Sequence, residues 1–191
     1  MLRSVLKSLR RPSAREGERR LHIGGVERTE GWEVLNALPG PAVDHVGHAA
    51  DLRRFPDGTF TALYSSHVLE HLDYKGELQA GLREWHRVLA PAGTLYVSVP
   101  DLATLAQLFL TAGLTPEQRF MVVRMIFGGH VDPHDYHQTA FDLEILAAFL
   151  REAGFVDIER VADFGLFDDT SRLVYAGVPI SLNVVARKPG G

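Results

Sequence analysis

The sequence predicts an α/β protein that is built on a mostly parallel sheet. Short apolar segments that suit strands alternate with segments of helical periodicity along most of the chain. The chain has 191 residues, of which 46% are hydrophobic and 23% charged, which is the composition of a globular domain. Because parallel strands are joined by crossovers that usually contain a helix, this alternation favours a parallel sheet with helices packed on it.

The first half of the chain has strand patterns with little helix between them. The expected strands cover residues 19–25, 32–38, 42–48 and 61–66. Pro56-Asp57-Gly58 marks a turn before the last of them. Only residues 26–32 separate the first two strands, whereas a parallel crossover usually takes about a dozen residues or more. We therefore expect the first two helices to be missing, which would leave one face of the sheet partly bare.

The second half of the chain carries clear helices. Helical periodicity covers residues 75–89, and the sequence APAG at 90–93 ends it before the buried strand 94–100. Asp101 stands where the next helix, 102–110, needs an N-cap. The remaining expected elements are helices over 115–127 and 141–154 and strands over 155–165 and 180–188.

Residues 1–18 form a basic N-terminal segment, and residues 19–191 are expected to fold as a single domain. Apolar residues recur at helical spacing within 2–10, which predicts a short basic amphipathic helix. This helix would pack on the domain or, alternatively, contact a membrane surface or RNA. The segment, or a second copy of the chain in a homodimer, is the expected cover for the bare face of the sheet.

Composition excludes several classes of protein. The net charge of −4 gives no general attraction to nucleic acid or anionic membranes, and no apolar run is long enough to span a bilayer. Cysteine is absent, which excludes disulfide scaffolds and cysteine–zinc sites and suits a cytoplasmic protein. The chain has no P-loop and no complete G-x-G-x-x-G sequence, so nucleotide hydrolysis and NAD binding have no support.

The stretch HVLEH at 67–71 spells H-x-x-E-H, a pattern that marks some zinc peptidases. A peptidase would hold both histidines on one face of a long helix, but His67 directly follows an expected strand. A metal hydrolase is therefore a remote alternative. In a parallel sheet the ligand sits at the carboxyl ends of the strands. Here these ends are residues 24–25, 36–38, 65–67 and 100–101.

Three segments of the sequence carry a resemblance to a known family. They are FPDGTFTALYSSHVLEHL at 55–72, LREWHRVLAPAGTLYVSVPD at 82–101 and AGFVDIERV at 153–161. Together they resemble class I S-adenosylmethionine-dependent methyltransferases, of the methyltransferase type 11-like group. The resemblance implies a Rossmann-like fold whose mostly parallel seven-stranded sheet has an antiparallel C-terminal strand. It also implies a transferase whose cofactor is S-adenosyl-L-methionine.

Three further stretches, RMIFGG, FGLFDDTS and ISLNVVA, are similar to a bacterial subset associated with surface glycans and natural-product biosynthesis. We therefore expect O-methylation of a small molecule or of a glycan sugar hydroxyl. The expected partner is a small-molecule or saccharide acceptor, with no nucleic acid. The alternative is a non-catalytic cofactor-binding or interaction protein that kept a degenerate methyltransferase fold.

On the cofactor side, the resemblance implies an extended ligand across the strand ends. Gly24 and Gly25 match the glycine-rich turn after the first strand, but His22 stands at the family's acidic position. Asn36 matches the carboxylate that holds the ribose, and Asp51 matches the acid that receives the adenine amino group. The candidates are Ile23, Gly24, Gly25, Asn36, Ala37, Asp51, Leu52, Ser65, Ser66 and His67.

On the acceptor side, the catalytic candidates are His71, His134, His137 and Asp101. Histidine titrates near neutral pH, so His134 or His137 suits a general base, whereas Asp101 is equally suited to cap a helix. Some related O-methyltransferases bind a divalent metal through E-x-x-E-H, which makes His67, Glu70 and His71 metal candidates. We favour the alternative in which Glu70 and His71 cap and pack the turn without a metal.

Overall fold

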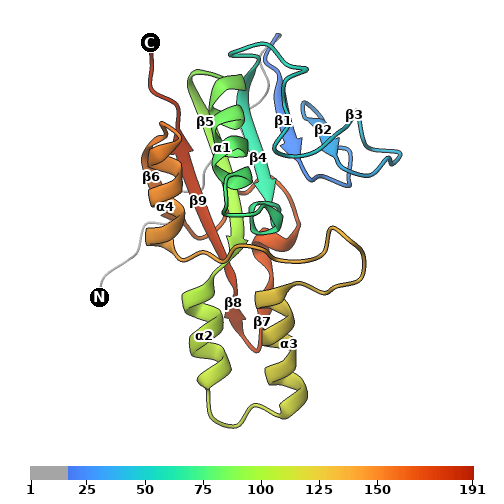
Figure 1. The fold of residues 1–191 in the computed structure, drawn as a ribbon, viewed down its shortest axis with the longest axis vertical. Helices are drawn as coiled ribbons and strands as arrows, with labels where there is room; N and C mark the ends of the chain where they lie inside the picture. The colour runs from blue at the N-terminus through green and yellow to red at the C-terminus, as the bar shows by residue number, and fades with distance from the viewer. Residues whose placement is uncertain (1–16) are drawn as a thin grey trace, which may run out of the picture.

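The computed structural model describes residues 17–191, so the helix expected over 2–10 lies outside the described residues. A seven-stranded sheet runs in the order β3-β2-β1-β4-β5-β9-β6 (Figure 1). Its strands are β1 Arg20–Ile23, β2 Glu33–Asn36, β3 His45–Val46, β4 Phe60–Ser66, β5 Leu89–Pro100, β6 Val156–Val161 and β9 Ser181–Arg187. The pairs from β3 to β5 are parallel, and β9 is antiparallel to both β5 and β6. The predicted sheet, with its antiparallel C-terminal strand, is confirmed.

The helices expected after residue 74 are all present. They are α1 Glu77–Val88, α2 Leu102–Leu110, α3 Pro116–Phe127 and α4 Leu143–Glu152. The carboxylate of Asp101 caps α2 by accepting a hydrogen bond from the backbone N–H of Thr104 at 3.4 Å. A capping box between Thr115 and Gln118 begins α3. Short elements complete the description: the 3₁₀ turns η1 Leu69–His71 and η2 Thr170–Arg172, and the hairpin of β7 Val174–Tyr175 and β8 Val178–Pro179.

One face of the sheet is covered by α1 and α4, and the main hydrophobic core lies between them and the strands (Figure 1). The helix α1 buries Leu78, Leu82 and Trp85 at helical spacing. The indole Nε1 of Trp85 donates a hydrogen bond to the carbonyl of Ala49 at 2.8 Å. This bond fixes the chain after β3 against α1.

Among the residues that the structure describes, a loop rather than helices covers the opposite face. The connections 24–32 and 37–44 contain no helix, as their lengths predicted. The loop 162–173, which follows β6, fills the space that such helices would take. Its Phe164 and Phe167 pack on Tyr64, with ring centroids 5.6 Å and 4.3 Å away. This cover was not expected: the expected covers were the basic N-terminal segment, which lies outside the described residues, and a second copy of the chain.

The strand β5 begins earlier than the sequence predicted. The sequence APAG was expected to separate α1 from a strand over 94–100, but β5 starts at Leu89, directly after α1. Leu89 pairs with Phe60, and the register then shifts before Thr94 pairs with Ala62. The proline and glycine of APAG therefore lie in an irregular strand end, which a bulge accommodates, instead of in a loop.

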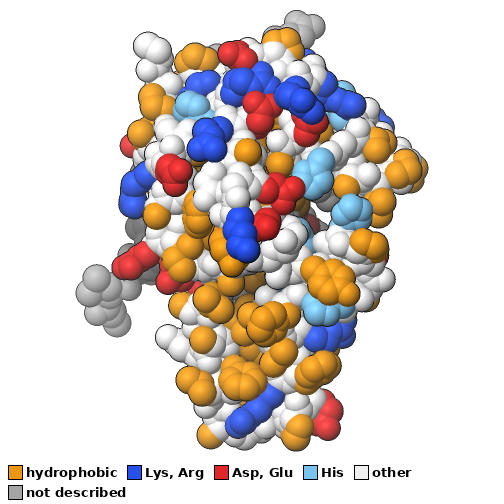
Figure 2. All heavy atoms as spheres, in the orientation of Figure 1, with side chains coloured by type: hydrophobic (Ala, Val, Ile, Leu, Met, Phe, Trp, Pro, Cys, Tyr) orange, Lys and Arg blue, Asp and Glu red, His pale blue; other side chains and the backbone are white. Residues whose placement is uncertain are grey.

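A lobe of α2, α3 and the β7–β8 hairpin extends beyond the carboxyl end of β5 (Figure 1). Its small core consists of Leu105, Leu108, Val122 and Ile180. The outer surface of the lobe carries many hydrophobic side chains, of which Leu110 and Phe120 are among the most exposed (Figure 2). Nevertheless, no helix between residues 17 and 191 is long and apolar enough to cross a membrane.

The loop that covers the second face should contribute measurably to stability. Phe164 is 5% exposed, so the Phe164→Ala change should lower the free energy of unfolding by about 3 kcal/mol. The matched control is Phe120→Ala, because Phe120 is 64% exposed and its loss should cost less than about 0.5 kcal/mol. Urea unfolding followed by circular dichroism measures both values. Equal costs for the two variants would contradict a packed loop.

Candidate functional site: a glycine-turn cavity and a histidine cluster

The turn after β1 is compact and held by hydrogen bonds. Gly24 has a φ of +84°, a conformation that favours glycine, and its N–H donates to the carbonyl of Leu35 at 2.7 Å. The amide Nδ2 of Asn36 donates to the carbonyl of Gly25 at 3.0 Å. A Cβ atom on Gly25 would lie 2.7 Å from Nδ1 of His22, so no larger residue fits there. The turn therefore admits no side chain at Gly25, which is itself buried.

A cavity of about 450 Å³ opens beside the glycine turn, at the carboxyl ends of β1 and β4. Its volume lies within the range of small-molecule sites, roughly 300 to 1,000 Å³. The lining residues are His22, Gly24, Gly25, Val26, Glu27, Thr29, Ser66, Leu166, Phe167, Asp168, Asp169 and Thr170. Two glycines, three hydroxyls, three carboxylates and a buried imidazole whose Nδ1 has no partner within residues 17–191 fit a polar cofactor such as S-adenosylmethionine.

The remaining cofactor candidates lie elsewhere. Ile23, Leu52 and Ser65 are fully buried, Ala37 is exposed, and the amide of Asn36 is occupied by the glycine turn. Asp51 lies in an exposed loop, where its carboxylate pairs with Arg53 at 2.7 Å. The structure thus brings Gly24, Gly25 and Ser66 together, but it does not bring Asp51 to the same cavity.

A second polar site begins directly after Ser66. His67 takes a φ of 54°, and this turns the chain from β4 into η1. Glu70 is 1% exposed, and neither of its carboxylate oxygens has a hydrogen-bond partner within residues 17–191. Burial raises the pKa of this carboxyl to about 8. A buried carboxyl without partners is costly, so its retention points to a ligand or a catalytic role.

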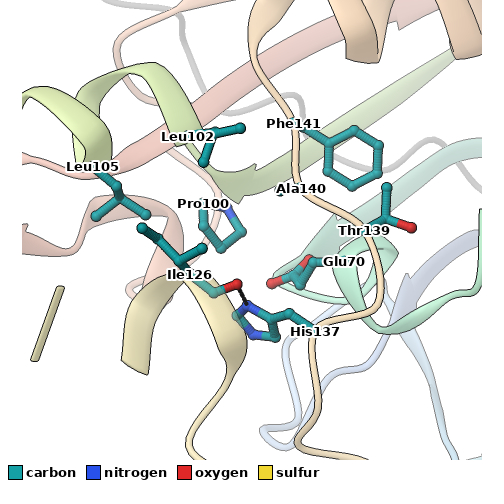
Figure 3. A pocket seen from close by; sticks show the side chains of 9 residues that line it. All are labelled: Glu70, Pro100, Leu102, Leu105, Ile126, His137, Thr139, Ala140 and Phe141. Atoms are coloured by element: carbon teal, nitrogen blue, oxygen red, sulfur yellow. Dashed lines mark hydrogen bonds between the residues drawn. The ribbon is translucent and has the colours of Figure 1, made fainter. Parts of the chain in front are cut away.

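Two histidines face Glu70. One ligand atom each from Glu70, His71 and His137 lies within 4.8 Å of the others, a spacing that suits a metal ion. The rings of His71 and His137 meet edge to face, with centroids 4.9 Å apart. Figure 3 shows Glu70 and His137 together at a small hollow that apolar side chains otherwise line. We call Glu70, His71 and His137 the histidine cluster.

The hydrogen bonds of the two rings determine which nitrogen is free. Nδ1 of His71 lies 3.2 Å from the carbonyl of Tyr136, and Nδ1 of His137 lies 3.2 Å from the carbonyl of Ile126. A carbonyl only accepts, so each Nδ1 carries a hydrogen, and in the neutral form of either ring the lone pair is on Nε2. Burial, followed by the nearby His71, lowers the pKa of His137 to about 4. His137 is therefore neutral at pH 7 and can bind a proton or a metal.

The segment that carries His137 is tied to η1. The backbone N–H groups of Gln138 and Thr139 both donate to the carbonyl of Glu70, at 2.7 Å and 3.0 Å. The hydroxyl of Thr139 donates to the carbonyl of Leu72 at 2.7 Å. These three bonds explain why residues so far apart in the sequence meet in one cluster.

His67, the first residue after β4, lies beside Glu70 of the cluster. The hydroxyl of Ser181 donates to the carbonyl of Thr170 at 2.7 Å, so Nε2 of His67, 2.9 Å from Ser181 Oγ, must donate to that hydroxyl. This leaves Nδ1 of His67 with a lone pair, 3.5 Å from a carboxylate oxygen of Glu70. Burial lowers the pKa of His67 to about 4, so the ring is neutral.

The other acceptor-side candidates are not in the cluster. The carboxylate of Asp101 is 3% exposed, caps α2 and pairs with Arg160 at 2.8 Å. His134 is exposed in the loop before His137, and its side chain is not among the clustered groups.

The sequence patterns did not predict the cavity residues of loop 162–173. Leu166 to Thr170 belong to the stretch FGLFDDTS, which carried only a family resemblance. Nothing in its pattern shows that it folds back onto β1, because that contact joins segments more than a hundred residues apart. His22 was recognised only as a departure from the acidic residue of the family.

The ionisation of Glu70 should appear in the stability of the metal-free protein. Its folded pKa of about 8 exceeds the usual 4.5, so its contribution is complete below pH 4.5 and is lost as the pH rises through 8. Between pH 6.5 and 8, wild-type protein should lose up to about 1.4 kcal/mol per pH unit relative to the Glu70→Gln variant. The pKa values of His67 and His137 are lowered, so these residues affect the free energy of unfolding only below pH 6.5. Both residues are present in wild type and variant, so their effect cancels in the difference. Urea unfolding with a chelator measures it, and a difference that does not change with pH would contradict the prediction.

The chain was compared with protein-family models, curated sequences and solved structures. Residues 29–97 match the family model described as a methyltransferase domain. Among solved structures, a SAM dependent methyltransferase from Archaeoglobus fulgidus is 16% identical, with a TM-score of 0.59 over 91% of this chain and 87% of that chain. No curated protein sequence matches the chain.

Two further solved structures contain the cofactor or its product. The 1,6-didemethyltoxoflavin-N1-methyltransferase of Burkholderia thailandensis, with bound S-adenosylhomocysteine, is 17% identical, with a TM-score of 0.54 over 89% of this chain and 71% of that chain. The phosphoethanolamine N-methyltransferase 2 of Haemonchus contortus, in complex with S-adenosyl-L-methionine, is 15% identical, with a TM-score of 0.55 over 94% and 50% of the two chains. At these identities the likeness establishes the fold. The methyltransferase-domain match covers about a third of the chain, and it lies within the sheet that this fold shares with S-adenosylmethionine-dependent methyltransferases.

Proposed function

We propose that this chain transfers a methyl group to the oxygen of a hydroxyl on a small molecule or a glycan sugar, and that the histidine cluster holds that hydroxyl. The observation that carries the proposal is the buried Glu70 carboxyl, which has no hydrogen-bond partner within residues 17–191 and faces the imidazoles of His71 and His137. The cluster starts where the cofactor cavity ends, because Ser66 lines the cavity and the next residue, His67, leads into η1.

Methyl transfer to a hydroxyl needs a group that removes a proton. Bound S-adenosylmethionine supplies a methyl group on sulfonium; transfer forms a carbon–oxygen bond, breaks a carbon–sulfur bond and releases the hydroxyl proton. A positioned imidazole is suited to accept that proton. The free Nε2 atoms of His71 and His137 are the candidates, since their Nδ1 atoms are held by carbonyls. The chain itself otherwise orients the acceptor.

The shape of the hollow beside the cluster bears on the acceptor. The hollow holds about 10 Å³, which is close to the space that one water molecule occupies. Its walls include Leu102, Leu105 and Phe141, so little else polar is available there. These dimensions favour an acceptor that inserts one hydroxyl and keeps its body at the surface, as a sugar would. The saccharide class itself rests on the sequence resemblance.

The same residues fit a divalent metal ion. The cluster offers two imidazole nitrogens and one carboxylate oxygen, and both rings donate Nδ1–H to a backbone carbonyl, as metal-bound histidines usually do. Such a donor set favours a softer ion than Mg²⁺. The sequence patterns had favoured a site without metal. A bound ion would neutralise Glu70 and lower the pKa of the acceptor hydroxyl. A homodimer and a cytoplasmic setting stay predictions of the sequence.

Removal of the cluster histidines should reduce turnover without weakening cofactor binding. We expect His71→Ala and His137→Ala to lower kcat by about 10²- to 10⁴-fold, the usual range for losing a general base. The matched control is His134→Ala, which lies in the same loop outside the cluster and should keep full activity. Methyl transfer to a panel of sugars and phenols gives the rates, and calorimetry with S-adenosylhomocysteine gives the affinities.

Unchanged turnover in both cluster variants would overturn the acceptor role of the cluster. Cofactor binding is tested separately, because the amide of Asn36 is engaged by the glycine turn and the carboxylate of Asp51 pairs with Arg53. A wild-type chain that binds no S-adenosylhomocysteine would favour the non-catalytic alternative.

A metal requirement is tested separately from the histidine variants. If the cluster binds an ion, purified protein incubated with Co²⁺ should retain about one ion per chain after dialysis, and Glu70→Gln and His137→Ala should each lose it. The absorption spectrum of bound Co²⁺ reports on nitrogen and oxygen ligands without any activity assay. His134→Ala serves again as the control. Retention of the ion by both cluster variants would place the metal elsewhere.

A further inference from the structure

The cavity at the glycine turn is acidic. Glu27, Asp168 and Asp169 line it, and no lysine or arginine is among its lining residues. S-adenosylmethionine carries a positive sulfonium and a positive α-ammonium group, so a cavity rimmed with carboxylates favours it electrostatically. The family resemblance has an acidic residue at the end of the first strand, but this chain has His22 at that position. The carboxylate must then come from another element.

Asp169 is the best-positioned of the three acids. Its carboxylate caps η2 by accepting from the N–H of Ser171 at 2.9 Å. It also accepts from the hydroxyl of Tyr64, which lies 3.0 Å and 2.9 Å from its two oxygens. Tyr64 is fully buried in the middle of the sheet, and its register partner on β1 is His22. Asp169 is thereby fixed over the strand that carries the glycine turn.

The neighbouring acids are arranged differently. Asp168 pairs with Arg172 at 3.1 Å and has a side chain that is 92% exposed, and Glu27 is exposed. No cationic side chain among residues 17–191 forms a salt bridge with Asp169. A second tie holds the loop in place, because the hydroxyls of Ser66 and Thr170 are 2.8 Å apart. Asp169 therefore keeps its charge available at a rigid cavity wall.

His22 provides an independent sign of a ligand. The residue is 7% exposed, lines the cavity, and its Nδ1 atom is buried without a hydrogen-bond partner. Its ring meets Tyr64 edge to face at 4.9 Å and Phe167 at 4.4 Å. Burial lowers the pKa of His22 to about 4, and the Asp169 carboxylate only partly opposes this. The ring is therefore neutral at pH 7, so it does not repel a cation.

We infer that Asp169 binds the α-ammonium group of the methionine part of S-adenosylmethionine, with Nδ1 of His22 beside it. The loop 162–173 thus supplies the acidic group that β1 lacks. This inference rests on the cofactor assignment, and it makes Asp169 a determinant of cofactor affinity. A charge-assisted hydrogen bond in a half-buried site is strong enough for the effect to be measured.

The test compares two ligands that differ only in the amino group: S-adenosylhomocysteine and its desamino analogue. The Asp169→Asn variant keeps an oxygen that caps η2 and accepts from Tyr64, so the fold should survive. We expect the variant to bind S-adenosylhomocysteine about 10- to 100-fold more weakly, the range for a hydrogen bond to a charged group. The desamino analogue should bind wild type and variant equally. Asp163→Asn is the matched control: Asp163 lies in the same loop but does not line the cavity, so this variant should keep wild-type affinity.

A second measurement needs no variant. The carboxyl ¹³C resonance of Asp169 in wild-type protein should shift when S-adenosylhomocysteine is added and should stay in place with the desamino analogue. Equal affinity of Asp169→Asn and wild type for S-adenosylhomocysteine, or an equal loss for both ligands, would overturn the inference while the methyltransferase assignment stands. Failure of wild-type protein to bind S-adenosylhomocysteine at all would overturn both.

Discussion

The parallel pairing of β1 between β2 and β4 is the constraint on which the rest of this structure depends. The connections that lead from β1 to β2 and from β2 to β3 are too short for helices, so one face of the sheet would stay open to water. Apolar surface there must be buried, and the loop 162–173 buries it with Phe164 and Phe167. Because this loop folds back onto the sheet, Asp168 and Asp169 lie at the cavity beside the glycine turn. The missing helices and the acidic cavity thus have one cause.

The two polar sites are neighbours because of a single change in chain direction. Ser66 ends β4 beside the cavity, and His67, in a left-handed conformation, turns the chain into η1 and the histidine cluster. A buried, unpartnered Glu70 lowers stability at neutral pH, since its carboxyl must stay protonated or find a ligand. Proteins tolerate such a cost mainly where a group has a chemical task. The hydrogen bonds from Gln138 and Thr139 then place His137 against it.

Much of the fold followed from local patterns. Apolar runs and helical periodicity located the strands and helices, and Asp101 marked the correct start of α2. The start of β5 was wrong, because a proline and a glycine were taken as a break when a bulge absorbs them. The candidate site was predicted less completely. Gly24, Gly25 and Ser66 meet as expected, but Asp51 lies apart in an exposed loop, where its carboxylate pairs with Arg53.

The sequence by itself determined the class of the sheet, the absence of its first helices and the residues available at each strand end. These properties follow from spacing and periodicity along the chain, which local rules describe. Only the tertiary structure decided that loop 162–173 covers the second face, that Asp169 faces His22 and that His137, rather than His134, joins Glu70 and His71. Each of these contacts joins distant segments through packing and hydrogen bonds, and no local pattern encodes which distant partner will fill a given space.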